Sequence, residues 1–242
     1  MIFINPYIYK LWTPAEITTE LWLDSADSSS ITLNGSNVST WADKSGNGRN
    51  ATQSTAGIQP AYTNNSIVFT SDRLNVPSSA WPNSDNVTLF LIGVGSSTGT
   101  AGVGLVNIRS NPADDPELRV YINTTVADYY NGGYAVNTSD AGLSSKGIVV
   151  FEHTPGVKSE FFVNGTSIAS GTRSGALSNT NTFELGYYSA INNYRNGTLW
   201  KVIVFSSSTV NRQKMEGWAA HSEGLASLLP ASHPYKLNPP YV

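Results

Sequence analysis

Residues 160–170 read EFFVNGTSIAS, two short runs rich in apolar and β-branched residues on either side of Asn164 and Gly165. A two-residue turn of type I′ needs positive φ at both central positions, and Asn-Gly is the pair that adopts this conformation most readily. The stretch therefore predicts a β-hairpin. The same signal recurs at Asn34-Gly35, which predicts a second tight turn near the N-terminus.

Short strand patterns follow one another along most of the chain. They are LWLD (21–24), SIVFTS (66–71), NVTLFLIGVG (86–95), LRVYIN (118–123), KGIVVFEHT (146–154), TFELGYY (182–188) and GTLWKVIVFS (197–206). The run at 86–95 is almost wholly apolar, as in a central strand, and the run at 118–123 alternates with period 2, as in a half-buried one. Only 13% of the residues are charged, so long helices with Lys- and Glu-rich surfaces are not expected.

One stretch near the C-terminus has helical periodicity instead. In 208–229, apolar and small residues recur on one face of a helix. These residues are Met215, Trp218, Ala219, Ser222 and Leu225. We predict one amphipathic helix near 208–226, ended by Gly224. Many closely spaced strands followed by one helix indicate an all-β fold, a sandwich of two antiparallel sheets with a C-terminal helix.

Three segments are expected along the chain: an N-terminal arm at 1–16, one sandwich at 17–229, and a Pro-rich tail at 230–242. The arm begins MIFINPYIYKLW and is apolar, so it could pair as an edge strand, pack on its own domain or dock into a neighbour. The candidate docking residues are Phe3, Ile4, Tyr7, Ile8, Tyr9, Leu11 and Trp12. We read the arm as neither a signal peptide nor a membrane span, because it lacks a basic start and Pro6 interrupts it.

Composition excludes several classes of protein. The 242 residues contain no cysteine, which rules out disulfides, thiolate metal sites and cysteine nucleophiles. The net charge is −3 and the chain has no basic block, so we expect no nucleic-acid partner. The three histidines, His153, His221 and His233, have neither metal-ligand spacing nor a nucleophile elbow beside them.

The stretch WADKSGNGRNA at 41–51 could be a phosphate loop, a metal loop or a structural turn. It lacks the Gly-Lys-Ser/Thr ending of a phosphate loop and the alternating acids and closing Glu of an EF-hand. We interpret it as a turn: glycines and asparagine permit positive φ, the aspartate accepts bonds from the loop, and the tryptophan anchors it to the core. The residues of this turn are Trp41, Asp43, Gly46, Asn47 and Gly48.

Several motifs, in this order, carry a family resemblance. They are LWLDSAD (21–27), WADKSGNGRNATQ (41–53), YRNGTLWKVIVF (194–205), RQKMEGWAAHSEGL (212–225) and LPASHPYK (229–236). Together they resemble the concanavalin A-like lectin/glucanase family, in the laminin-G-like branch seen in phage virion proteins and bacterial surface proteins. The resemblance implies a jelly-roll sandwich in which the WADKSGNG loop is a framework element and the helix packs against the sheets. The arm at 1–16 lies outside it.

Catalytic and metal sites are not expected. Glycoside hydrolysis needs two carboxyl groups across the sugar, whereas Glu160 and Glu184 each stand alone. The acidic cluster of Asp114, Asp115 and Glu117, in a stretch with two prolines, is a weak calcium candidate or a solvated turn. We therefore predict no catalytic residue, no metal and no cofactor.

Sugar binding needs exposed aromatic rings beside amide and charged groups. Two stretches, 128–137 and 186–197, offer such groups. The candidates are Tyr129, Tyr130, Tyr134, Tyr187, Tyr188, Asn193, Tyr194 and Arg195. Alternate tyrosines could equally be core or sheet-surface residues.

Two hypotheses of function follow. In the first, the chain is a non-enzymatic phage virion protein at the virion surface, a capsid decoration or cement protein or a head or tail fibre component. It would dock through its arm onto major capsid or fibre proteins, as a homo-oligomer such as a trimer. The alternative is a glycan-binding, lectin-like module for host or surface attachment, and the two are compatible.

Overall fold

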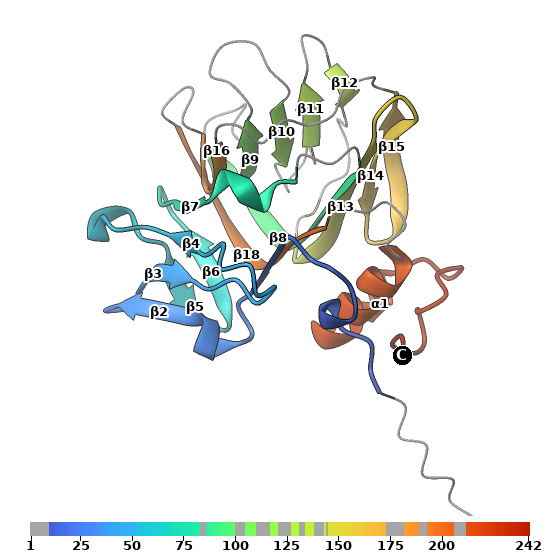
Figure 1. The fold of residues 1–242 in the computed structure, drawn as a ribbon, viewed down its shortest axis with the longest axis horizontal. Helices are drawn as coiled ribbons and strands as arrows, with labels where there is room; N and C mark the ends of the chain where they lie inside the picture. The colour runs from blue at the N-terminus through green and yellow to red at the C-terminus, as the bar shows by residue number, and fades with distance from the viewer. Residues whose placement is uncertain are drawn as a thin grey trace, which may run out of the picture.

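The computed structural model describes residues 10–82, 86–99, 105–109, 117–120, 127–130, 134–137, 143, 145–172, 182–188, 193–205 and 212–242. Within these ranges the strands pair antiparallel and form a sandwich, and one α-helix, α1 (Arg212–Ser222), lies near the C-terminus (Figure 1). The all-β sandwich with a C-terminal helix is therefore confirmed. No helix in the described residues is long and apolar enough to cross a membrane.

Strand pairing defines a first sheet around two long strands. Its order is β1 (Leu21–Asp24), β18 (Asn193–Phe205), β8 (Val87–Gly99), β13 (Gly147–Thr154), β14 (Lys158–Val163) and β15 (Thr166–Gly171). The predicted hairpin joins β14 to β15, with φ of 49° at Asn164 and 80° at Gly165. The Asn-Gly signal thus placed a tight turn correctly, because its two residues tolerate positive φ.

A second sheet faces the first. Its order is β4 (Ala51–Thr52), β7 (Leu74–Val76), β16 (Thr182–Leu185), β9 (Val106–Arg109), β10 (Glu117–Val120), β11 (Ala127–Tyr130) and β12 (Tyr134–Asn137).

The sheets are linked at one side by β2 (Ile31–Asn34), β3 (Asn37–Trp41), β5 (Ala61–Thr63) and β6 (Ser66–Phe69). There β6 pairs with the start of β18, where β17 (Tyr187–Tyr188) also pairs. Short 3-10 helices span Pro14–Glu16, Ser28–Ser30, Ala56–Ile58, Ser78–Ala80 and Ala226–Leu228.

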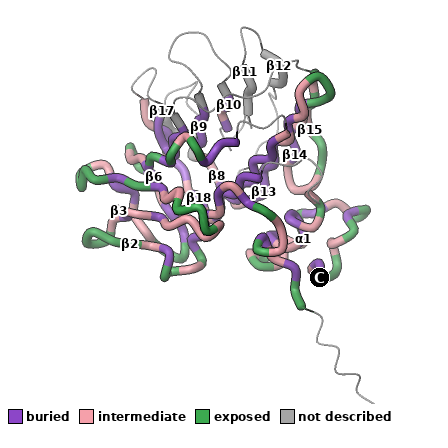
Figure 2. Tube along the Cα trace, in the orientation of Figure 1, coloured by how far each residue is buried: buried purple, intermediate pink, exposed green. Residues whose placement is uncertain are grey.

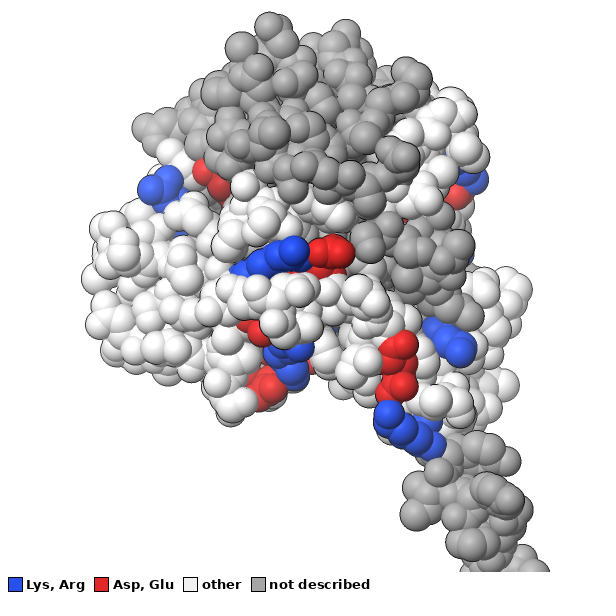
Figure 3. Space-filling model, in the orientation of Figure 1, with Lys and Arg blue, Asp and Glu red and all other residues white. Residues whose placement is uncertain are grey.

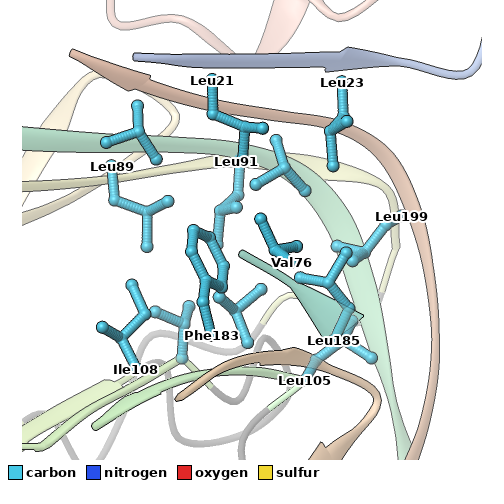
Figure 4. Close-up of a cluster of buried hydrophobic side chains, with 14 of the residues drawn as sticks. Leu21, Leu23, Val76, Leu89, Leu91, Leu105, Ile108, Phe183, Leu185 and Leu199 are labelled. Carbon is cyan, nitrogen blue, oxygen red and sulfur yellow. The ribbon is translucent and has the colours of Figure 1, made fainter. Parts of the chain in front are cut away.

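The main core lies between the two sheets. Leu89 and Leu91 of β8 point towards Phe183 and Ile108 of the second sheet, as Figure 4 shows. The intervening residues of β8 point the other way, into a second apolar cluster against α1. This sheet is therefore covered on both faces, as the purple tube of β8, β13 and β18 in Figure 2 indicates. Burial on both faces is the reason that the run at 86–95 is almost wholly apolar.

Helix α1 lies on the outer face of the first sheet. Met215 and Ala219 are buried there, in agreement with the predicted face, but Ser222 is exposed and Glu216 is fully buried. The prediction missed Glu216 because periodicity treats a carboxylate as a surface group. The structure pairs it with Arg212, two contacts of 2.6 Å, and with His233 of the tail at 3.2 Å.

The two ends of the described chain pair with each other beside α1. Leu11 forms a β-bridge with Tyr241, and the Trp12 N–H donates to the Pro240 carbonyl at 3.0 Å. The Trp12 side chain is 4% exposed and packs in the second apolar cluster. Residues 10–16 and the tail therefore lie against the sandwich.

Candidate functional site

The loop at 41–51 is a hydrogen-bonded turn whose polar groups are used within the chain. The Asp43 carboxylate accepts from the backbone N–H groups of Trp22, Ser45 and Arg49 at 2.9–3.0 Å. Trp41 is fully buried, Gly46 and Gly48 have φ of 90° and 71°, and the Asn47 amide donates to the Thr19 and Glu20 carbonyls. The loop builds the fold and leaves no binding group free at Asp43.

A row of polar residues crosses the second sheet on the side away from the main core. The register aligns Thr40, Thr52, Asn75, Glu184, Asn107 and Arg119 on successive strands from β3 to β10. Their chain neighbours, such as Leu74 and Val76, are buried in the core. Because side chains alternate across a sheet, the row belongs to the outer face. Thr52 and Asn75 are exposed, whereas Glu184 and Asn107 are buried.

A groove of about 320 Å³ opens at the exposed end of this row. It is lined by Ser39, Thr40, Thr52, Gln53, Ser54 and Asn75. Hydroxyl and amide groups both donate and accept hydrogen bonds, so they suit a ligand with many hydroxyl groups. Figure 3 shows that charged side chains are sparse on the face of the molecule in view and that several lie beside groups of opposite sign.

Two tyrosine rings lie close to Arg73, the residue that directly precedes β7. The rings of Tyr187 and Tyr194 are 4.7 Å apart at 44°, and the Arg73 guanidinium lies 4.5 Å from the centre of the Tyr187 ring. The Asn107 amide, in the polar row, donates to the Tyr187 carbonyl at 2.9 Å. Gly186 precedes Tyr187 with φ of 75°, and a Cβ there would collide with the Phe69 ring, so glycine is required at this bend.

The residues expected to bind sugar lie on two pairs of strands, β11 with β12 and β17 with β18. Tyr187 and Arg195 are 6% and 4% exposed, while Tyr194 and Asn193 are half-buried. The backbones of Tyr129 and Tyr130 lie in β11, that of Tyr134 in β12 and that of Tyr188 in β17, and their side chains lie outside what the structure describes. Tyr129 is in register with Leu118 of the core, whereas Tyr130 is in register with Glu117 and Tyr134. A side-chain contact is shown between the rings of Tyr187 and Tyr194.

The remaining candidates are placed as follows. Asp114 and Asp115 lie outside the described residues, and Glu117 begins β10. Within the described residues, no three acidic or histidine side chains gather closely enough to hold a metal ion. Of the arm, Leu11 is 52% exposed and Trp12 is buried, while Phe3, Ile4, Tyr7, Ile8 and Tyr9 lie outside the described residues.

Sequence reasoning missed the polar row and Arg73. The sequence LNV at 74–76 does alternate, with a polar residue between two apolar ones. Three residues are too few for this alternation to predict a strand. Alternation shows that Asn75 faces outward. Only strand pairing shows that Asn75 lies beside Thr52 and Glu184.

No family model and no curated protein match this sequence. Solved structures do match its fold. Trypanosoma rangeli sialidase superposes with a TM-score of 0.60 and 16% identity, over 90% of this chain and 36% of that chain. Domain 4 of AbnA, a GH43 extracellular arabinanase from Geobacillus stearothermophilus, in complex with arabinotriose, gives a TM-score of 0.56 and 12% identity over 78% and 93% of the two chains.

The binding domain of Paraclostridial Mosquitocidal Protein 1 gives a TM-score of 0.55 and 13% identity, over 82% of this chain and 51% of that one. The chain thus corresponds to a part of the sialidase and to nearly the whole arabinanase domain. At these identities the likeness shows the fold alone, an antiparallel β-sandwich.

Proposed function

We propose that this chain is a non-enzymatic, lectin-like module that binds a glycan on the outer face of its second sheet. The observation that carries the proposal is the groove of about 320 Å³ lined by hydroxyl and amide side chains. Its volume is at the small end of the range for ligand pockets, roughly 300–1,000 Å³. Sugar hydroxyls can donate to and accept from the Thr52 hydroxyl and the Asn75 amide.

The surroundings of Glu184 favour binding over hydrolysis. Most glycoside hydrolases use a second carboxyl group about 5–10 Å from the first. The register places Asn75 and Asn107 on the strands beside Glu184, and both carry amides. The similar structures support a binding role by analogy, since one is a domain in complex with arabinotriose and another is a toxin binding domain.

A glycan array followed by calorimetry tests the proposal. We expect the full chain to bind a defined set of glycans, and Asn75→Ala or Thr52→Ala to weaken binding at least tenfold. Both side chains are exposed, so the substitutions should leave the fold intact. Ser170→Ala, an exposed position on β15 of the first sheet, is the matched control. An array without a bound glycan, or binding that Asn75→Ala leaves unchanged, would reject this function.

A role at the surface of a phage virion, as a capsid decoration protein or fibre component, is our second candidate. One observation favours attachment at the paired termini: Leu11, Leu237 and Val242 are 52%, 84% and 65% exposed. A largely apolar pocket of about 210 Å³ lies there, lined by Leu11, Trp12, Thr13, Trp218, His221, Ser222 and Pro239. Exposed apolar patches commonly mark protein contacts.

The expected partners are major capsid or fibre proteins, bound by a homo-oligomer. Light scattering on the full chain and cosedimentation with capsids test this role. A defined oligomer that sediments with capsids would support it. A monomer that remains in the supernatant would reject it without affecting the glycan proposal.

A further inference from the structure

Arg73 lies at the edge of the polar face with its guanidinium stacked on an aromatic ring. Its central carbon is 4.5 Å from the centre of the Tyr187 ring. A guanidinium is planar and weakly hydrated, so a tyrosine ring can hold it in one orientation while its edge stays available for hydrogen bonds.

The side chain of Arg73 has no acceptor within the part of the chain that the structure describes. Its Nε is buried without a hydrogen-bond partner, and no carboxylate forms an ion pair with it. Its terminal nitrogens are not among the buried unbonded atoms, so they reach solvent. Arg49 and Arg212, by contrast, hold Glu20 and Glu216. A partly desolvated cation without a partner is unfavourable unless a ligand supplies one.

The adjacent carboxyl group does not serve as that partner. Oδ2 of Asp72 accepts from the Thr70 backbone N–H at 2.7 Å, which directs it into its own turn. Burial raises the pKa of Asp72, and the hydrogen bond from Thr70 only partly opposes this. Among the described residues, the positive charge of Arg73 is therefore not neutralised by a carboxylate.

Arg73 lies next to a groove residue along the chain. It directly precedes β7 (Leu74–Val76) and is two residues from Asn75, so their Cα atoms are about 7 Å apart and alternation puts both on the outer face. Asn75 lines the groove, and Tyr187 is bonded through its carbonyl to Asn107 of the polar row.

We propose that the bound glycan is acidic and that Arg73 recognises a sugar carboxylate, with Tyr187 positioning the guanidinium. The inference rests on the proposed glycan-binding function and names its ligand class. Arginine matches a carboxylate because two parallel N–H groups meet two oxygens, and the two terminal nitrogens of Arg73, which reach solvent, can supply such a fork. Uronic acids and sialic acids both present this carboxylate.

The test measures binding of the full chain to four probes by calorimetry. The acidic probes are trigalacturonate and 3′-sialyllactose, and their neutral counterparts are carboxyl-reduced trigalacturonate and lactose. We expect at least one acidic probe to bind at least tenfold more tightly than its counterpart, and the preferred pair identifies the source of the carboxylate. Arg73→Gln should remove this preference, and Arg73→Lys should retain part of it. Lys158→Gln, an exposed cation on the first sheet, controls for net charge.

The possible outcomes distinguish failure of the acidic-ligand proposal from failure of the glycan-binding proposal. Equal binding of acidic and neutral probes overturns the role of Arg73 and leaves glycan binding in place. An acidic preference that survives Arg73→Gln likewise overturns it. If neither these probes nor an array shows binding, both proposals fail. If Arg73→Gln unfolds, the same four probes are compared on the unmodified chain and on Arg73→Lys. A preference for the acidic probes that Arg73→Lys leaves unchanged would overturn the role of Arg73.

Discussion

Oδ1 of Asp43 accepts a hydrogen bond from the backbone N–H of Trp22 at 2.9 Å, and the N–H of Lys44 donates to the Trp22 carbonyl at 2.8 Å. The opposite side of β1 pairs with β18. The loop after Trp41 therefore takes the place of a neighbouring strand along β1. Satisfying these backbone groups stabilises β1 and protects an edge that could otherwise pair with another chain.

We predict that Asp43→Ala lowers the free energy of unfolding by about 2–4 kcal/mol, because it leaves three backbone N–H groups without an acceptor. Urea denaturation followed by tryptophan fluorescence measures the change. Ser54→Ala, at an exposed position, should shift it by less than about 0.5 kcal/mol. A loss for Asp43→Ala as small as that of the control would show that the loop does not support β1.

A buried ion cluster joins β1, β18 and the end of α1. The Lys201 ammonium, 2% exposed, lies 2.6 Å from Asp24 and 2.7 Å from Glu223. Removing only the cation leaves two carboxylates in a poorly solvated site. We predict that Lys201→Met costs about 3–5 kcal/mol of stability.

The triple variant Lys201→Met/Asp24→Asn/Glu223→Gln should recover most of that loss, because it also neutralises the two carboxylates, which Lys44 and Lys146 alone would otherwise face. Thermal and urea denaturation of both variants make the comparison. Equal destabilisation of the single and triple variants would contradict the electrostatic explanation.

Glu152 predicts a pH dependence of stability. Burial raises its pKa from 4.5 to about 7, against the opposing charge of Arg212. Between these values the folded state binds the proton more tightly than the unfolded state, so the free energy of unfolding falls as pH rises through this window. Glu152→Gln should therefore stabilise the protein at pH 8 by about 1–3 kcal/mol and have little effect at pH 4.5. Denaturation curves at both pH values provide the measurement. An equal change in stability at pH 4.5 and pH 8 would argue against this assignment.

Two N-terminal deletions distinguish an external arm from a part of the fold. Removing residues 1–9 should leave stability within about 0.5 kcal/mol, because the described contacts begin at Lys10. Removing residues 1–14 also deletes the buried Trp12 and its bond to Pro240, so it should cost about 3–5 kcal/mol. Unfolding experiments on both proteins provide the measurement. Equal stabilities would show that Trp12 contributes nothing to the core.

Local patterns of sequence predicted the fold well where one residue type has one conformational consequence. Asn164-Gly165 predicted a hairpin because both residues tolerate positive φ, and the apolar run at 86–95 predicted a central strand. The candidate site was harder to predict from the sequence. The tyrosines drew attention by their number, yet Tyr187 is largely buried, and Arg73 gave no signal because one arginine in a polar stretch resembles any surface residue.

The sequence by itself determined the class of fold, the tight turns and the helix, because these depend on backbone preferences and on periodicity over a few residues. Only the tertiary structure decided which distant residues meet. Register aligned Thr52, Asn75 and Glu184 across three strands, and a bend at Gly186 brought the Tyr187 ring against Arg73. The contacts of Asn75 with Glu184 and of Arg73 with Tyr187 join residues more than a hundred positions apart, and strand pairing, which no local pattern encodes, sets them.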